Sequence, residues 1–171
     1  MARKYTLDES DDTFLATAGR RYVHVIDILA PPGRVWEALC ADDALVSWSS
    51  MITRVEWTSP RPFGVGTTRV VTLAGAVRLE ERFYRWNVDE RMTFTVDAAS
   101  IPGLRRFGED ITLEKTTGGT RLTWTFALEG ETGVRPLLWL LDPANRIVTS
   151  GIARGISRRI QDSPVLPGAG K

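Results

Sequence analysis

The sequence predicts an α+β fold with an antiparallel sheet of about seven strands, two short helices after the first strand and a long helix near the C-terminus. Three observations favour this class. Apolar residues recur at every second position through most of residues 22–128, which is typical of strands with one buried face. Helical spacing begins directly behind Pro31-Pro32, and a longer helical stripe occupies residues 143–161. Strands followed by one long helix indicate a sheet with its helices grouped on one face.

Seven segments alternate as strands do. The first spans residues 22–30, and the last, over residues 120–128, shows the pattern most clearly. Its apolar side chains share one face and its polar side chains the other: Leu122, Trp124, Phe126 and Leu128 against Arg121, Thr123 and Thr125. The other strands are expected over residues 52–58, 67–73 and 77–86 and around residues 92–96 and 111–113. The two strands beside Ala74-Gly75 are expected to form a hairpin.

Proline marks the start of the main predicted helices. It lacks an amide donor and fixes φ, so Pro31-Pro32 ends the first strand and suits the first turn of a helix through Cys40. Asp42 is expected to cap a second short helix that ends near Ser47. Asp142-Pro143 separates a short helical piece near residues 136–141 from the main helix, which continues to about Gln161. At 1.5 Å per residue that helix is ~30 Å long, enough to cross a small sheet.

The chain length predicts one domain. With 171 residues, a single core is expected over residues 20–162. Residues 1–19 are polar and acidic, and they are expected to form a flexible arm. The Pro- and Gly-rich residues 163–171 are expected to form a flexible tail.

Charge and composition exclude several classes of partner. The net charge of +1 gives no electrostatic case for nucleic acid or an anionic membrane surface. One cysteine, Cys40, and one histidine, His24, argue against a disulfide and against a metal cluster, and no cofactor is expected. The sequence has neither a membrane-span pattern nor a signal pattern, so a cytoplasmic protein is expected.

Several motifs occur in the order seen in a known superfamily. They are Ile28-x-Ala30-Pro31-Pro32-x-x-Val35-Trp36-x-x-Leu39, Trp48, Gly64-Val65-Gly66-Thr67, Glu81-Arg82-Phe83-x-x-Trp86-x-x-x-x-Arg91-Met92 and Gly119-Thr120-Arg121-Leu122-Thr123-Trp124. Over residues 21–161 this chain resembles the START-like (SRPBCC) superfamily with the helix-grip fold, and within it the polyketide cyclase/dehydratase-type branch. The resemblance implies a curved sheet wrapped around the C-terminal helix, with space between them for an apolar or amphipathic small molecule. None of these motifs is a catalytic signature.

Four side chains are candidates for an acid or base. Counting by twos from Ala30 puts His24 on the face that this resemblance assigns to the cavity; the alternative is a strand-end histidine satisfied by a neighbour or by water. Glu81 and Glu109 alternate with apolar residues, so each points into the cavity or reaches water at a strand end. A buried glutamate would have a raised pKa or an arginine partner, for which Arg69 and Arg82 are candidates. Tyr84 is a fourth candidate if the protein is an enzyme.

Aromatic and aliphatic side chains supply the candidates for ligand contact. Trp36 and Trp124 are assigned to the core. The six candidates for the cavity wall are Tyr22, Trp48, Phe83, Phe94, Trp139 and Ile152.

Three functions are compatible with these residues. The first is binding of a hydrophobic or amphipathic small molecule, of lipid, polyketide or aromatic type. The second is a polyketide cyclase/dehydratase-like reaction promoted by a cavity acid or base. The third is a co-chaperone-like interaction module, and Val23, Val25 and Leu29 on the outer face of the first strand would allow a homodimer. The absence of a recognisable catalytic dyad favours binding.

Overall fold

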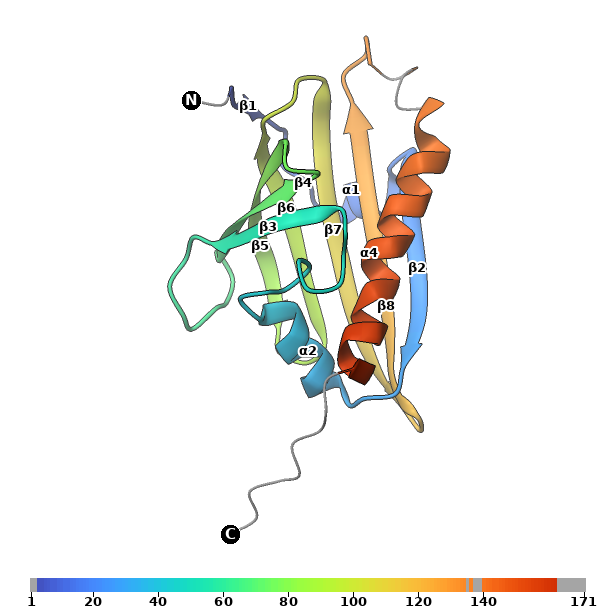
Figure 1. Cartoon of the computed structure of the whole chain (residues 1–171). Helices are drawn as coiled ribbons and strands as arrows, with labels where there is room; N and C mark the ends of the chain where they lie inside the picture. The colour runs from blue at the N-terminus through green and yellow to red at the C-terminus, as the bar shows by residue number, and fades with distance from the viewer. Residues whose placement is uncertain (1–2, 135, 137–139, 163–171) are drawn as a thin grey trace.

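The computed structural model describes residues 3–134, 136 and 140–162. Seven strands form the main path of the sheet, with one helix after the first strand and a long helix after the last (Figure 1). The strands are β2 (Arg20–Ile28), β3 (Ile52–Trp57), β4 (Thr68–Leu73), β5 (Val77–Asn87), β6 (Arg91–Ala99), β7 (Leu104–Thr116) and β8 (Gly119–Gly130). The helices are α2 (Pro32–Cys40) and α4 (Asp142–Asp162). None of the helices within the described residues is long and apolar enough to cross a membrane.

The sheet is antiparallel and runs in the order β2-β8-β7-β6-β5-β4-β3. Strands β3 to β8 are therefore consecutive hairpins, and β2 lies beside β8 at the far edge. Helix α4 crosses the face of the sheet, and α2 lies near its C-terminal end (Figure 1). This architecture confirms the predicted α+β class, the antiparallel sheet of about seven strands and the long C-terminal helix.

The core lies between the sheet and the two helices. Three inward side chains of β8 are fully buried, as the alternation predicted, and a fourth, Leu128, is partly buried: the three are Leu122, Trp124 and Phe126. From α4, Ile152, Ala153 and Ile156 pack against them, and α2 adds Val35, Trp36 and Leu39. Burying each large apolar side chain contributes about 1.5–3 kcal/mol, so this contact fixes α4 on the sheet.

Two irregularities in the pairing of β5 with β6 decide which side chains face inward. The register shifts between Glu80 and Glu81 and again between Phe83 and Arg85. The second shift leaves Tyr84 on the outer face and returns Trp86 to the inner core.

One predicted element is absent: residues 42–48 form successive turns where the sequence predicts a second short helix. Leu45 has a φ of 66°, a left-handed conformation that an α-helix of L-residues does not accommodate. The turn buries the Leu45 side chain in the core, and the Asp42 carboxylate accepts a hydrogen bond from Arg61. Tertiary contacts thus override the local capping signal.

The N-terminal segment is packed on the outer face of the sheet, where the sequence predicts a flexible arm. Strand β1 (Tyr5–Thr6) pairs with β6, and helix α1 (Asp12–Thr17) buries Phe14 and Leu15. Asp11 caps α1 by accepting a hydrogen bond from the Phe14 amide. These elements are too short to show a periodicity, and their burial depends on a sheet that the segment itself does not encode.

Gly108 makes this packing possible. A Cβ atom at residue 108 would lie 2.7 Å from the Ser10 Cβ and 3.1 Å from the Phe94 carbonyl oxygen. The chain therefore crosses β7 at a position where only glycine leaves enough space. The Ser10 amide donates a hydrogen bond to Thr95 on the same outer face.

Candidate functional site

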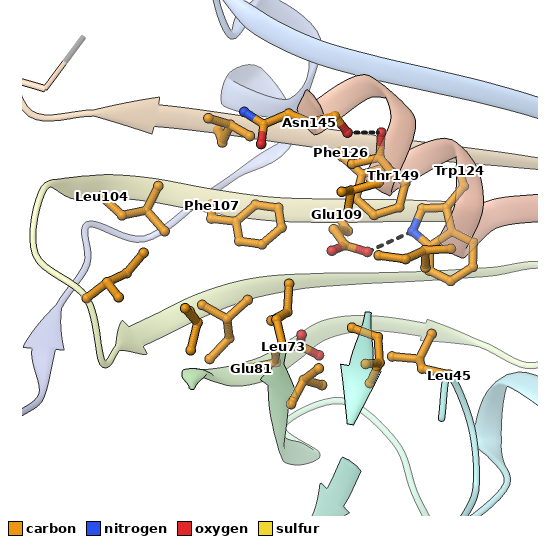
Figure 2. A pocket seen from close by; sticks show the side chains of 18 of the residues that line it. Leu45, Leu73, Glu81, Leu104, Phe107, Glu109, Trp124, Phe126, Asn145 and Thr149 are labelled. Carbon is orange, nitrogen blue, oxygen red and sulfur yellow. Dashed lines mark hydrogen bonds between the residues drawn. The ribbon is translucent and has the colours of Figure 1, made fainter. Parts of the chain in front are cut away.

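A cavity of about 220 Å³ lies between the sheet and α4 (Figure 2). Its wall is mostly apolar. The apolar lining residues are Leu45, Ile52, Val71, Leu73, Val77, Leu79, Ile101, Leu104, Phe107, Trp124, Phe126, Leu128, Val148 and Ile152. Helix α4 also contributes Asn145 and Thr149, whose side chains are uncharged.

Three ionisable residues line this apolar space. Glu81 comes from β5, Glu109 from β7 and Arg69 from β4, and all three are buried. Figure 2 shows the side chains of Glu81 and Glu109 in the same cavity, on different strands. The alternation of β5 and β7 left two alternatives for each carboxylate, the cavity or water at a strand end, and the structure has both in the cavity wall.

Arg69 is paired with Glu81 and enclosed by aromatic rings. Its Nε donates a hydrogen bond of 2.5 Å to Glu81 Oε2, and both side chains are 3% exposed. The guanidinium carbon lies 5.0–5.2 Å from three ring centroids, those of Trp57, Phe83 and Phe94. The rings hold the cation by cation–π attraction and exclude water from the ion pair.

Glu109 has a different partner. Its Oε2 accepts a hydrogen bond of 2.7 Å from the indole Nε1 of Trp124, which lies on the neighbouring strand β8 (Figure 2). Burial, and after it the nearby negative charge of Glu81, raises the pKa of Glu109 to about 8, although Trp124 and Arg69 act to lower it. Burial also raises the pKa of Glu81, but its ion pair with Arg69 opposes that shift.

The other two predicted acid–base candidates do not line the cavity. His24 lies behind Thr149, with 2.9 Å between its Nε2 and the Thr149 hydroxyl. That hydroxyl donates to the Asn145 carbonyl, so His24 Nε2 is the donor to Thr149. Burial, with Arg154 and Arg146, lowers the pKa of His24 and favours the neutral ring. Tyr84 lies on the outer face beside α1 and donates to Asp12.

The predicted ligand-contact residues differ in their position relative to the cavity. Ile152 lines the cavity. Phe83 and Phe94 stand behind it, as two of the rings around Arg69. Tyr22 donates to Asp142 and joins β2 to the start of α4, and Trp48 donates from Nε1 to the Ile152 carbonyl. Trp139, the sixth candidate, lies outside the described residues.

Sequence reasoning missed most of the cavity wall, but it named Arg69 as one of two candidate partners for a buried glutamate, and Arg69 is the partner of Glu81. Trp124, assigned to the core, is buried and also lines the cavity. The signal for Arg69 was present: it alternates with Val71 and Leu73, so its side chain shares their inward face. An arginine in an apolar inward row indicates a buried partner.

No metal site is evident in the described part of the chain. Among these residues, no three His, Cys, Asp or Glu side chains lie together in a way that could hold a metal ion. The cavity therefore offers hydrogen bonds, one buried ion pair and apolar contact.

Residues 20–161 match the family described as polyketide cyclase / dehydrase and lipid transport. An uncharacterized protein of Mycobacterium tuberculosis is 34% identical over 146 residues, covering 85% of this chain and 87% of the relative. A START superfamily protein from Mycobacterium smegmatis superposes with a TM-score of 0.67 at 11% identity, covering 84% of this chain and 98% of that one. A protein of Thermus thermophilus gives a TM-score of 0.67 at 19% identity, covering 82% and 97%. These structural likenesses confirm the START-like fold.

Proposed function

This chain belongs to the polyketide cyclase / dehydrase and lipid transport family, and from that premise we propose that it binds a hydrophobic or amphipathic small molecule between the sheet and α4. The observation that carries the proposal is the cavity itself. Its wall is apolar apart from a few polar groups, of which Arg69, Glu81 and Glu109 are ionisable. Small-molecule sites have this composition, because apolar contact supplies affinity and a few polar groups fix the orientation.

The size of the cavity limits the ligand. A cavity of ~150 Å³ in another protein accepts benzene. The 220 Å³ here therefore suits a compact ligand of one or two rings, or a short branched chain, better than a long acyl lipid. Many ligand pockets are larger, about 300–1,000 Å³, so a bulkier ligand would require the wall to move.

Native mass spectrometry of freshly purified protein, followed by denaturing extraction, tests for a co-purified ligand. A titration with 2-ethylnaphthalene, an apolar two-ring probe, then tests the cavity directly. Val148→Phe adds a ring at the cavity wall and should abolish binding. Val65→Phe places the same change at a residue that is 73% exposed and should leave binding unchanged. Absence of binding by the wild type, or equal binding by both variants, would contradict the proposal.

A cyclase- or dehydratase-like enzyme is the second candidate. The observation that favours it is Glu109, a buried carboxyl whose raised pKa suits a general acid near neutral pH. Turnover of a polyketide-type substrate that Glu109→Gln abolishes without weakening substrate binding would favour the enzyme. Binding without turnover would favour the carrier.

Two expectations from the sequence stay predictions. One is a cytoplasmic location. The other is a homodimer through the outer face of β2 and the residue after it, where Val25 is 58% and Leu29 is 77% exposed. Sedimentation of the purified protein measures the second.

A further inference from the structure

The cavity contains more acidic groups than cationic groups. Glu81 and Glu109 both line it, and Arg69 is the only cation among the described lining residues. Two ionised carboxylates beside one guanidinium would leave a net negative charge in an apolar enclosure. Such a charge is costly, and a buried carboxyl avoids the cost by keeping its proton.

Geometry indicates which carboxyl is neutral. Arg69 donates directly to Glu81 at 2.5 Å, and the surrounding rings hold the guanidinium in that position. Glu81 therefore carries the negative charge of the ion pair. Glu109 accepts from the uncharged indole of Trp124, so it is the group that keeps its proton. Burial raises the pKa of both carboxyls, so the assignment rests on the direct bond from Arg69 to Glu81.

The Trp124 bond also locates the proton on Glu109. The indole N–H is only a donor, so Glu109 Oε2, which receives it, acts as the acceptor oxygen. The proton is then on Oε1. Figure 2 shows the second oxygen of Glu109 directed away from Trp124. Glu109 thus presents an O–H donor to the cavity.

We propose that Glu109 is the specificity-determining residue of the cavity and donates a hydrogen bond from its neutral carboxyl to an uncharged oxygen acceptor of the ligand. The ligand class is then a compact apolar molecule with a ketone, aldehyde or quinone-type carbonyl. A carboxylate ligand is disfavoured, because it would bring a negative charge beside Glu81 without a further cation among the described lining residues. This inference rests on the proposed binding function.

The pH dependence of ligand affinity should come from Glu109, because the other groups that face it add no net charge. From β4 and β5 these groups are Arg69 and Glu81, which neutralise each other. From β8 and α4 they are uncharged, because the lining residues there are Trp124, Phe126, Leu128, Asn145, Val148, Thr149 and Ile152. His24 lies beyond Thr149 and favours its neutral form.

Three probes with one ring system test the proposal by calorimetric titration: 2-acetonaphthone, 2-ethylnaphthalene and 2-naphthoic acid. Below pH 8, the ketone should bind about tenfold more tightly than the ethyl compound, a factor typical of one good hydrogen bond. The acid should bind more weakly than both. Above the Glu109 pKa of about 8, the advantage of the ketone should disappear.

Two variants separate hydrogen bonding from shape. Glu109→Gln keeps an uncharged donor, so the preference for the ketone should persist on both sides of pH 8. Glu109→Met removes the donor, so the ketone and the ethyl compound should bind equally. The infrared carbonyl band of a protonated carboxyl, present at neutral pH in the wild type and absent in Glu109→Gln, checks the protonation without any ligand.

The outcomes are distinguishable. Binding of 2-ethylnaphthalene without a preference for the ketone would overturn the role of Glu109 and leave the binding function in place. Absence of binding by all three probes would overturn both. Tightest binding of the acid, or absence of the protonated-carboxyl band, would also overturn the inference.

Discussion

Glu81 and Glu109 carry different charges in the same cavity because their immediate neighbours differ. Glu81 lies opposite Arg69 in the β4–β5 ladder, and the two side chains form a buried ion pair. Glu109 lies beside the indole of Trp124 and receives a hydrogen bond without a compensating charge. Two residues of one type thus supply one anion and one neutral donor.

The partner of Glu81 was within reach of sequence reasoning. The turn at Ala74-Gly75 fixes the hairpin register, and that register places Arg69 opposite Glu81. Alternation offered the inward face of Glu109 as one of two alternatives, the other being water at a strand end. Its partner Trp124 could not be predicted, because the contact depends on the packing of side chains between β7 and β8.

The protonation of Glu109 makes stability depend on pH. Its pKa in the folded protein is raised to about 8, so the folded state holds this proton where the unfolded chain has lost it. The stabilisation is complete below the unfolded pKa and is lost as pH rises through about 8. Between pH 5 and pH 9, the free energy of unfolding of the wild type should therefore fall by about 3–5 kcal/mol more than that of Glu109→Gln. Urea unfolding across this range measures the difference, and parallel curves for the two proteins would contradict it.

Removal of Arg69 should be strongly destabilising. Arg69→Met leaves Glu81 buried without its cation, at a cost of about 3–5 kcal/mol in the free energy of unfolding. The double variant Arg69→Met, Glu81→Gln removes the uncompensated charge and should recover much of that loss. A double-mutant cycle by urea unfolding measures the coupling. Equal stability of the single and double variants would show that the ion pair is not the reason for the cost.

At the scale of elements, α4 is held at its centre by the loop that carries Trp48. The Trp48 indole donates to the Ile152 carbonyl at 3.1 Å. One turn further on, a Cβ at Gly155 would lie 2.5 Å from Trp48 Cδ1 and 2.6 Å from the Trp48 carbonyl oxygen. The helix and the loop can approach this closely only with glycine at residue 155.

Two glycines of α4 give a matched pair of variants. Gly155→Ala should destabilise the protein by about 1–3 kcal/mol, because the backbone of the Trp48 loop must move. A Cβ at Gly151 would meet no heavy atom within 4 Å, so Gly151→Ala should stabilise the helix by up to about 1 kcal/mol. Thermal unfolding of both variants measures the contrast. Equal effects would refute the close contact between α4 and Trp48.

The sequence predicted those strands and helices that are long enough for their apolar residues to show a regular spacing. Strands β2 to β5, strand β8 and the helices α2 and α4 were predicted close to their observed bounds. Strands β6 and β7 were predicted to exist, but β7 extends over Leu104–Thr116, well beyond residues 111–113. Helix α1 has only six residues, and β1 has two, so neither could show one. The turns at residues 42–48 depend on the left-handed backbone of Leu45, which its sequence does not favour.

At the scale of the whole molecule, the two faces of the sheet make different contacts. The inner face and α4 enclose the cavity, and the N-terminal segment covers part of the outer face (Figure 1). Stability can therefore change on one face while the other keeps its ligand-binding surface.

Phe14→Ala tests this division. Phe14 is buried in the outer cluster with Leu15 and Ala127, so its truncation should cost about 3–5 kcal/mol in the free energy of unfolding. The affinity for 2-ethylnaphthalene should stay within twofold of the wild type wherever the variant is folded. Thermal unfolding and probe titration on one preparation measure both quantities. A large loss of affinity would show that the outer face shapes the cavity.

The most direct test of the central claim is a titration with 2-acetonaphthone followed through the tryptophan indole N–H signals in ¹⁵N-labelled protein. Trp124 lines the cavity and donates to Glu109, whereas Trp48 and Trp57 donate to backbone carbonyls elsewhere. Assignment by Trp124→Phe identifies the signal. Binding in the cavity predicts that the Trp124 signal moves further than those of Trp48 and Trp57 and saturates with the probe. A saturating response confined to Trp48 or Trp57, or no response at all, would contradict a ligand site between the sheet and α4.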